Sequence, residues 1–324
     1  MAVSYLTKTE LGQFLHQSGN IEASVRSALI DSLEDSGVFH EGGKDPARGW
    51  FESGHFPGGA APPTIQILDV SSSTTVQTTP NLKAIIMDDA GGMHLNVTDT
   101  PNAHNDVFIA MGEGSDSVNL FDSGNDTVYG GSGHDMIGGG NATGNSSLFG
   151  GDGNDSIYGG SGSDTLDGGA GNDYLQAGTG AQSLVGGAGN DLLKDLTSSG
   201  HSTLSGGSGN DTLVGGQGDF LQGDDGQDVF WLHGGAPGAN STLQGGNGND
   251  TFHIQTHTGN DTIIGGNGND TVDFANRSFY DVAKIDVDAS TSTYTLHFND
   301  NQTVSVTGVE NLHFTDQDVH LPKL

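Results

Sequence analysis

The sequence predicts an all-β protein, a flattened right-handed parallel roll (β-solenoid) built from nine-residue repeats. The first observation is the repeat GGxGxDxUx, in which U is apolar; short periods of this kind are typical of solenoids. Complete GGxGxD copies begin at Gly130, Gly150, Gly159, Gly168, Gly186, Gly206, Gly245 and Gly265. The second observation is the apolar position, which persists where the rest of the repeat degenerates. It is held by Val118, Val128, Ile137, Leu148, Ile157, Leu166, Leu175, Leu184, Leu193, Leu204, Leu213, Leu221, Phe230, Leu243, Phe252, Ile263 and Val272.

Each repeat predicts one short strand and one turn. Side chains of a strand alternate between its two faces, so one inward side chain per repeat fits a strand of about three or four residues. The glycines supply the backbone freedom that a tight turn needs. Two nonapeptides should therefore complete one coil.

When the copies are assigned alternately to two edges of the roll, the edges differ. Edge A carries nine aspartates: Asp116, Asp135, Asp155, Asp173, Asp191, Asp211, Asp228, Asp250 and Asp270. Edge B carries Asp126, Ser146, Asp164, Gln182, Ser202, Asp219, Ser241 and Asp261. The step from edge B to edge A is always nine residues, whereas the step from A to B varies between 8 and 13. We expect regular bends on edge A and irregular loops on edge B.

These repeats, over about residues 111–273, resemble those of the repeats-in-toxin (RTX) calcium-binding family. The resemblance implies a parallel β-roll in which each Ca²⁺ lies between turns of successive coils, held by aspartate carboxylates and glycine carbonyls. It implies as ligands the nine edge A aspartates and the glycines two positions before them: Gly114, Gly133, Gly153, Gly171, Gly189, Gly209, Gly226, Gly248 and Gly268. On edge B it implies Asp126, Asp164 and Asp261.

Elementary chemistry favours the same metal. Calcium takes six to eight oxygen ligands, which a turn of glycines around an aspartate can offer. Coils stacked at about 4.8 Å would otherwise place carboxylate beside carboxylate. Nine edge A turns leave eight gaps, so we expect about eight Ca²⁺ ions on edge A and one to three on edge B. The alternative, a glycine-rich disordered linker, conflicts with the unbroken apolar series.

The charge of the chain predicts that this metal is needed for folding. The net charge is -32, and Lys194 is the one basic residue between Lys83 and Arg277. Without a counter-ion such a chain should resemble an acidic disordered polymer, so metal binding should supply its folding free energy. The same acidity excludes nucleic acid as a partner, because it would repel phosphate.

The flanking regions have other compositions. Residues 1–63 are predicted to form a small N-terminal helical cap, with two amphipathic helices within 5–35, followed by a Pro/Gly-rich loop over 36–63. Residues 64–110 should form early solenoid coils without calcium motifs, and 111–273 the calcium-binding roll. Residues 274–324 should form a C-terminal antiparallel strand cap, which closes the open end of the solenoid. Its strands are expected at 282–287, 294–298 and 303–306.

The sequence also carries signals of location. It has no cysteine and no apolar run of 18 residues, and its first residues lack the basic and apolar regions of a Sec signal. We therefore expect no membrane span and no Sec leader. The resemblance implies export from a Gram-negative bacterium by a type I system, with a signal in the C-terminal segment. Calcium is abundant outside cells, so we expect a secreted, extracellular or cell-surface protein.

Catalysis has little support in the sequence. The tract HEGGKDPARGWFESGH, residues 40–55, is rich in polar groups but matches neither an HExxH zinc helix nor a GxSxG nucleophile turn. We expect no enzyme. The alternative is a small secreted enzyme or toxin whose active part lies in about the first hundred residues, with the roll serving export and folding.

The outward positions suggest what the roll does. On strands after edge A they include Met136, Tyr158, Tyr174, Leu192, Val214, Val229 and Trp231. If exposed, this apolar face predicts self-association into an oligomer, filament or lattice; cover by the N-terminal helices is the alternative. On strands after edge B the first outward residues are Thr127, Ser147, Thr165, Ser183, Thr203, Phe220, Thr242 and Thr262. This mostly hydroxyl row offers ice or cell-surface polysaccharide as an alternative ligand. We expect a structural protein of a surface layer, filament or biofilm matrix.

Overall fold

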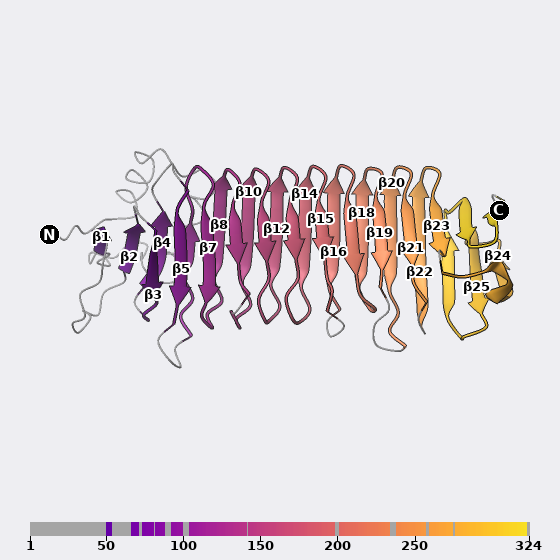
Figure 1. The fold of residues 1–324 in the computed structure, drawn as a ribbon, viewed down its shortest axis with the longest axis horizontal. Helices are drawn as coiled ribbons and strands as arrows, with labels where there is room; N and C mark the ends of the chain where they lie inside the picture. The colour runs from indigo at the N-terminus through magenta and orange to yellow at the C-terminus, as the bar shows by residue number, and fades with distance from the viewer. Residues whose placement is uncertain are drawn as a thin grey trace. The chain divides into compact units, whose positions relative to one another are not determined.

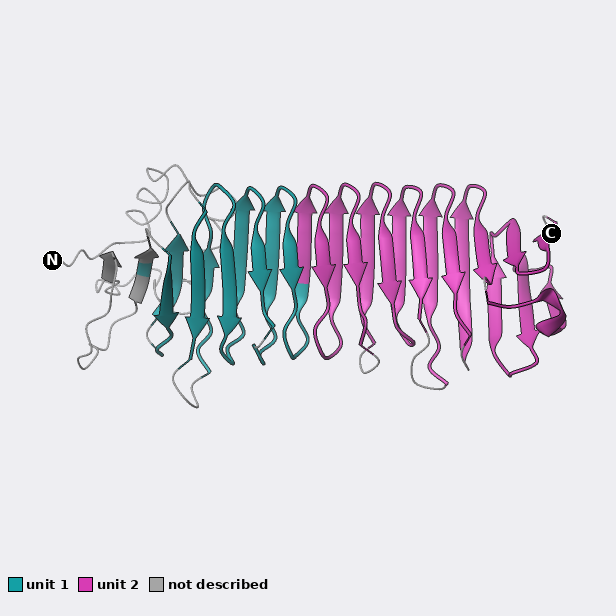
Figure 2. Ribbon diagram, in the orientation of Figure 1, with its two compact units in different colours: residues 1–165 teal, residues 166–324 magenta. Residues whose placement is uncertain are grey.

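The computed structural model describes residues 50–53, 66–70, 73–80, 82–87, 92–99, 104–140, 142–197, 201–233, 238–256, 259–274 and 276–322. The helices expected within 5–35 lie outside these residues. Two compact units divide the chain at residue 165, unit 1 comprising residues 1–165 and unit 2 residues 166–324 (Figure 2).

Unit 1 is a parallel solenoid in which the chain passes between two sheets. The first sheet has the order β1(Trp50–Ser53), β2(Gln66–Val70), β4(Leu82–Met87), β6(Phe108–Ala110), β8(Thr127–Ser132) and β10(Ser147–Asp152). The second sheet has the order β3(Thr74–Gln77), β5(His94–Thr98), β7(Ser117–Phe121), β9(Met136–Gly138) and β11(Ser156–Tyr158). Every neighbouring pair in these two series is parallel.

Unit 2 repeats this arrangement and then changes it at the C-terminal end (Figure 1). Its first sheet has the order β12(Thr165–Ala170), β14(Ser183–Ala188), β16(Thr203–Ser208), β18(Phe220–Asp225), β20(Thr242–Asn247), β22(Asn260–Asn267), β26(Thr303–Thr307), β25(Thr293–Phe298) and β24(Val282–Asp288). Its second sheet has the order β13(Tyr174–Gln176), β15(Leu192–Lys194), β17(Thr212–Gly215), β19(Val229–Leu232), β21(Thr251–Ile254), β23(Thr271–Phe274), β27(Asn311–Phe314) and β28(Asp318–His320). The 3₁₀ helix η1(Phe279–Asp281) precedes β24.

The C-terminal cap combines parallel and antiparallel pairing. Strand β26 pairs in parallel with β22, and β27 pairs in parallel with β23, so both continue the coil. The pairs β24–β25, β25–β26 and β27–β28 are antiparallel. The parallel sheets of unit 2 thus end in hairpins, where a bare solenoid would expose the whole edge of its last coil.

The core is a stack of the inward apolar residues. All seventeen predicted positions, from Val118 to Val272, have 0% exposure. In unit 2 two of them, Phe230 and Phe252, stack with their ring centroids 4.6 Å apart. Neighbouring coils hold these residues in register, for example Leu184 beside Leu204. One such side chain per strand provides most of the apolar burial available to each coil, at about 2–3 kcal/mol for each leucine.

The prediction for residues 36–63 is wrong in part, because residues 50–53 form strand β1 rather than loop. Strand β1 pairs with β2 over four residues, from Trp50 opposite Gln66 to Ser53 opposite Asp69. The early coils are present in residues 66–110 as strands β2 to β6. The glycines and prolines of this tract give it a low strand propensity, so the sequence did not predict β1. Strand formation there depends on a partner strand rather than on local propensity.

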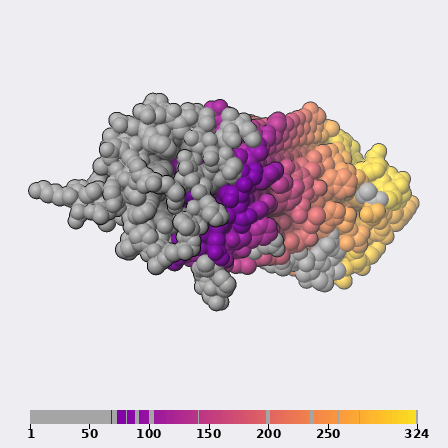
Figure 3. Space-filling model, turned by 60° about the vertical axis from the view of Figure 1, so that its left-hand side comes forward, coloured from indigo at the N-terminus to yellow at the C-terminus, as the bar shows by residue number. Residues whose placement is uncertain are grey.

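The outer faces carry rows of side chains in register, and consecutive coils form parallel bands on the surface (Figure 3). On the first sheet of unit 2, Thr203, Phe220 and Thr242 are neighbours, so Phe220 interrupts the hydroxyl row. The predicted apolar positions of the second sheet are only partly exposed: Met136 in unit 1 is 41% exposed, and in unit 2 Trp231 is 37% exposed whereas Val214 is buried.

Candidate metal centre

The edge A aspartates form hydrogen-bonded ladders between successive coils. In each ladder, one carboxylate oxygen, Oδ1, of an aspartate accepts from the backbone N–H of the aspartate one coil before it, whereas Asp116 Oδ1 accepts from the N–H of Met93. In unit 1 this bond joins Asp116 to Asp135 at 2.8 Å and Asp135 to Asp155 at 2.7 Å. In unit 2 it joins Asp173, Asp191, Asp211, Asp228, Asp250 and Asp270 in sequence, at 2.8 to 2.9 Å. These bonds explain why aspartate, with its short side chain, recurs at this position.

In six of these aspartates the second oxygen, Oδ2, is buried and has no donor among the described residues. Within the described residues no hydrogen-bond partner reaches Oδ2 of Asp135, Asp191, Asp211, Asp228, Asp250 or Asp270. These six side chains are at most 2% exposed. A buried charge that is neither paired nor hydrogen-bonded is costly, so a row of such oxygens indicates that a cation belongs beside them.

The first glycine of each bend keeps a space open beside that oxygen. A Cβ at Gly130 would lie 2.7 Å from Asp135 Oδ2 and would overlap the carbonyl oxygen of Gly150. In unit 2 a Cβ at Gly186 would lie 2.6 Å from the carbonyl oxygen of Gly206 and would overlap Asp191 Oδ2. A carboxylate oxygen and a carbonyl oxygen of the next coil therefore face the same point, at distances close to the 2.3–2.6 Å of calcium–oxygen bonds.

Burial perturbs the acidity of these aspartates. It raises the pKa of Asp135 and Asp228 to about 7, and the pKa of Asp211 and Asp270 to about 6. Loss of hydration is the main cause; the backbone N–H bond opposes it, and neighbouring carboxylates such as Asp155 beside Asp135 add to it. Without a cation, each of these groups therefore resists the charge that it would carry at neutral pH.

The nine glycines implied as ligands, Gly114 to Gly268, all have positive φ, between +116° and +152°. A Cβ at Gly248 would overlap the carbonyl oxygen of Gly226 in the preceding coil. The backbones thus approach each other so closely that only glycine fits. A ligand role for the carbonyls of these nine glycines stays a prediction.

Edge B differs at the same repeat position. Both carboxylate oxygens of Asp164 accept backbone N–H groups, of Ser146 and of Gly160, each at 2.8 Å. Asp261 accepts from the N–H of Ser241 at 3.1 Å and from Gln302 Nε2 at 3.4 Å. Asp126 accepts from the Val107 N–H at 2.9 Å, while burial and then the adjacent Asp122 carboxylate raise its pKa. In two of the three edge B aspartates, Asp164 and Asp261, both carboxylate oxygens thus already accept hydrogen bonds from the protein. The ligand roles of all three remain predictions.

A second ladder, of asparagines, accompanies the aspartates. In unit 2 the Asn190 N–H donates to Asn172 Oδ1 at 2.7 Å, and the Asn210 N–H donates to Asn190 Oδ1 at 2.7 Å. Further along, the Asn269 N–H donates to Asn249 Oδ1 at 2.8 Å. The sequence interpretation missed these residues, although their signal, an Asn before the Asp of each GGxGND bend, is present.

The edge A residues offer the oxygen ligands and the negative charge that calcium requires. No three His, Asp or Glu side chains converge as a metal-binding group within the ranges that the structure describes. Two consecutive coils bring one carboxylate each to a bend, and carbonyls of the glycine bends must provide the remaining oxygens of a six- to eight-fold shell. Oxygen ligands without nitrogen or sulfur favour calcium over transition metals.

Comparison with protein families identifies the ligand of the repeats. The family model of the RTX calcium-binding nonapeptide repeat, four copies long, matches residues 122–142, 141–175, 176–194, 196–219, 206–236, 238–253 and 253–276. Residues 122–276 thus carry RTX calcium-binding repeats. Its RTX repeats bind calcium, and its parallel β-solenoid is a β-roll. No curated protein matches the chain. Among the residues described, no helix is long and apolar enough to cross a membrane.

Proposed function

We propose that this RTX protein is a secreted structural element that folds when it binds calcium outside the cell and then associates with further copies of itself. The row of buried edge A carboxylates carries the proposal. At a net charge of -32, the roll cannot bring these groups together cheaply without cations. A compartment rich in calcium would therefore trigger folding, and one poor in calcium would keep the chain extended.

Secretion is consistent with the family, because RTX repeat proteins are typically secreted. Type I export from a Gram-negative bacterium is part of the proposal. An exporter passes an unfolded chain more easily than a folded one, and a roll that requires calcium would remain unfolded in a cytosol where calcium is scarce. A surface layer, filament or biofilm matrix is the structural role that this behaviour suits.

Self-association is supported by the outer face of the second sheet of unit 2. Trp231 is 37% exposed and stacks on the His253 ring at a centroid distance of 3.9 Å. His253 Nδ1 in turn lies 2.8 Å from Asp273 Oδ2, which fixes the ring pair on the sheet. A rigid, exposed aromatic group on a flat sheet is the kind of anchor that protein interfaces use.

Sedimentation velocity in calcium tests this proposal. Trp231→Asp should reduce the assembled fraction at least about ten-fold, because it places a charge in the centre of the contact. Tyr280→Asp is the matched control, since Tyr280 is 87% exposed but lies outside the sheet face. Ordered filaments or sheets in electron micrographs of the wild-type protein would support the proposal; a monodisperse monomer with calcium bound would contradict it.

A further inference from the structure

The C-terminal cap extends the edge A ladder by one step without a nonapeptide. The Asp270 N–H donates to Glu310 Oε2 at 2.9 Å, in the way that the Asp250 N–H donates to Asp270 Oδ1 at 2.9 Å. Strand register agrees, because Thr271 lies opposite Asn311, as Thr251 lies opposite Thr271 one coil earlier. Glu310 therefore takes the place that an aspartate has in the coils before it.

Gly308 takes the place of the first glycine of the bend. Ile264 lies opposite Thr307, so the next residues, Gly265 and Gly308, are neighbours. A Cβ at Gly265 would lie 2.5 Å from Asp270 Oδ2 and would overlap the carbonyl oxygen of Gly308. The same two kinds of oxygen face each other here as between repeat coils.

The cap makes this bend with fewer residues. From its first glycine to its aspartate the last repeat runs from Gly265 to Asp270, whereas the cap runs only from Gly308 to Glu310. The extra methylene of glutamate extends its carboxylate further than aspartate could, which suits the shorter bend. No repeat motif reveals this bend, and the family matches end at residue 276.

The buried oxygen of Asp270 points to a ligand. Asp270 is 0% exposed, and its Oδ2 has no hydrogen-bond partner in the described part of the chain. At edge B, in contrast, the cap supplies a hydrogen-bond donor to the last aspartate, Asp261. Asp261 accepts from Gln302, and Gln302 Oε1 accepts from the guanidinium of Arg277, a residue only 5% exposed. The cap thus brings donors and a cation to edge B, but brings a further carboxylate to edge A.

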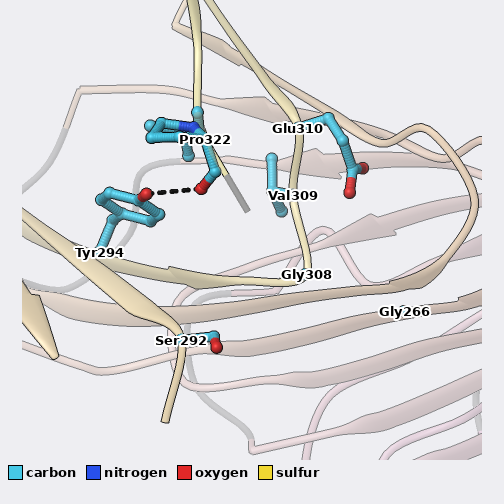
Figure 4. Close-up of a pocket in the computed structure, with 8 residues that line it drawn as sticks. Gly266, Ser292, Tyr294, Gly308, Val309, Glu310 and Pro322 are labelled. Carbon is cyan, nitrogen blue, oxygen red and sulfur yellow. Dashed lines mark hydrogen bonds between the residues drawn. The ribbon is translucent and has the colours of Figure 1, made fainter. Parts of the chain in front are cut away.

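We propose that Asp270, Gly308 and Glu310 form a closing calcium site, in which the cap supplies ligands for the last ion of the row. The inference rests on calcium binding by the repeats. Gly308, Val309 and Glu310 also line a cavity of about 260 Å³, opposite Tyr294, whose hydroxyl donates to the Pro322 carbonyl at 2.7 Å (Figure 4). Docking of β26 and β27 and binding of this ion then stabilise each other.

Glu310→Gln tests the site, because glutamine still accepts the Asp270 N–H but carries no charge. Hydrogen exchange of residues 303–314 is followed against free calcium, with residues 203–225 as an internal reference. We expect the calcium midpoint of 303–314 to rise about ten-fold or more while that of 203–225 stays unchanged, and native mass spectrometry to show one ion fewer at limiting calcium. Asp318→Asn is the matched control, since the Asp318 carboxylate is 81% exposed in the same cap.

Equal midpoints and equal ion counts for wild type and Glu310→Gln would overturn the closing site. If both segments failed to respond to calcium in the wild-type protein, the calcium switch itself would be wrong. Should Glu310→Gln leave the cap unprotected at every calcium concentration, Glu310→Asp decides the question. Partial recovery of protection by calcium in Glu310→Asp supports a charged ligand, whereas protection no better than that of Glu310→Gln would overturn the proposal.

Discussion

An aspartate on edge A and one on edge B hold the same place in the repeat, but their second oxygens meet different surroundings. In unit 2, Asp211 Oδ2 has no donor among the described residues. Asp219 Oδ2 accepts the N–H of Gly216 at 2.7 Å, and Asp219 Oδ1 accepts the N–H of Ser202 at 2.9 Å. A carboxylate that protein donors satisfy needs no metal, whereas one left half satisfied in a buried bend does.

This difference predicts opposite phenotypes for two asparagine substitutions. Asp211→Asn should remove at least one bound calcium and raise the calcium concentration needed for folding, because it deletes a charged ligand. Asp219→Asn should leave the ion count unchanged and lower the stability of the calcium-loaded roll by about 1–3 kcal/mol, because an edge B turn loses an acceptor. Native mass spectrometry and denaturant unfolding in calcium measure the two effects; an equal loss of ions in both variants would contradict the edge assignment.

The raised acidities of the edge A carboxyls predict a pH dependence. In the folded, calcium-free roll the pKa of Asp135 and Asp228 is about 7, against 3.8 for an ordinary aspartate. The folded state then binds more protons than the unfolded state between about pH 4 and pH 7, so the free energy of unfolding falls as pH rises through that window. Sheet content of the calcium-free protein should be higher at pH 5 than at pH 8, by circular dichroism, and calcium affinity should be lower at pH 5. Equal sheet content at the two pH values would contradict this expectation.

At the scale of the element, the bend limits the sequence more strictly than the strand does. Gly248 has a φ of +138°, and a Cβ there would overlap the Gly226 carbonyl. Gly238 has a φ of +90°, yet a Cβ there would meet nothing within 4 Å. The two positions separate backbone strain from contact between coils.

Alanine at these two glycines should therefore differ in cost. Gly238→Ala should cost about 1–2 kcal/mol, the strain of a left-handed backbone alone. Gly248→Ala should cost more, because the coils must also move apart at a metal-binding bend. Denaturant midpoints in saturating calcium compare the two variants; equal shifts would mean that the close approach of the coils is not required.

Residue spacing predicted most of these elements. One apolar residue per nine was enough to place Leu184 and Leu204 in the core, because the repeat fixes which side chain points inward. The repeat could not predict β1, which depends on a partner strand. The repeat did not predict the role of Glu310 either, because its bend departs from the nine-residue spacing. Sequence periodicity predicts what every coil shares, and the structure is needed for what ends or interrupts the series.

At the scale of the whole molecule, the central quantity is charge. Each calcium ion adds two positive charges to a chain whose net charge is -32. Eight ions, the number expected from the edge A gaps, would halve that charge and would place the compensation where burial makes it most valuable. Many strands, such as β11, β13 and β15, bury a single apolar side chain, so we infer that the ions decide whether the roll folds.

Far-UV circular dichroism of the purified chain at pH 8, first in excess chelator and then in millimolar free calcium, tests this claim most directly. We predict a largely disordered spectrum without calcium and a strong β-sheet spectrum after its addition, with a cooperative midpoint between them. The same sheet spectrum in both conditions would show that the carboxylate rows fold without a cation, and it would contradict the account.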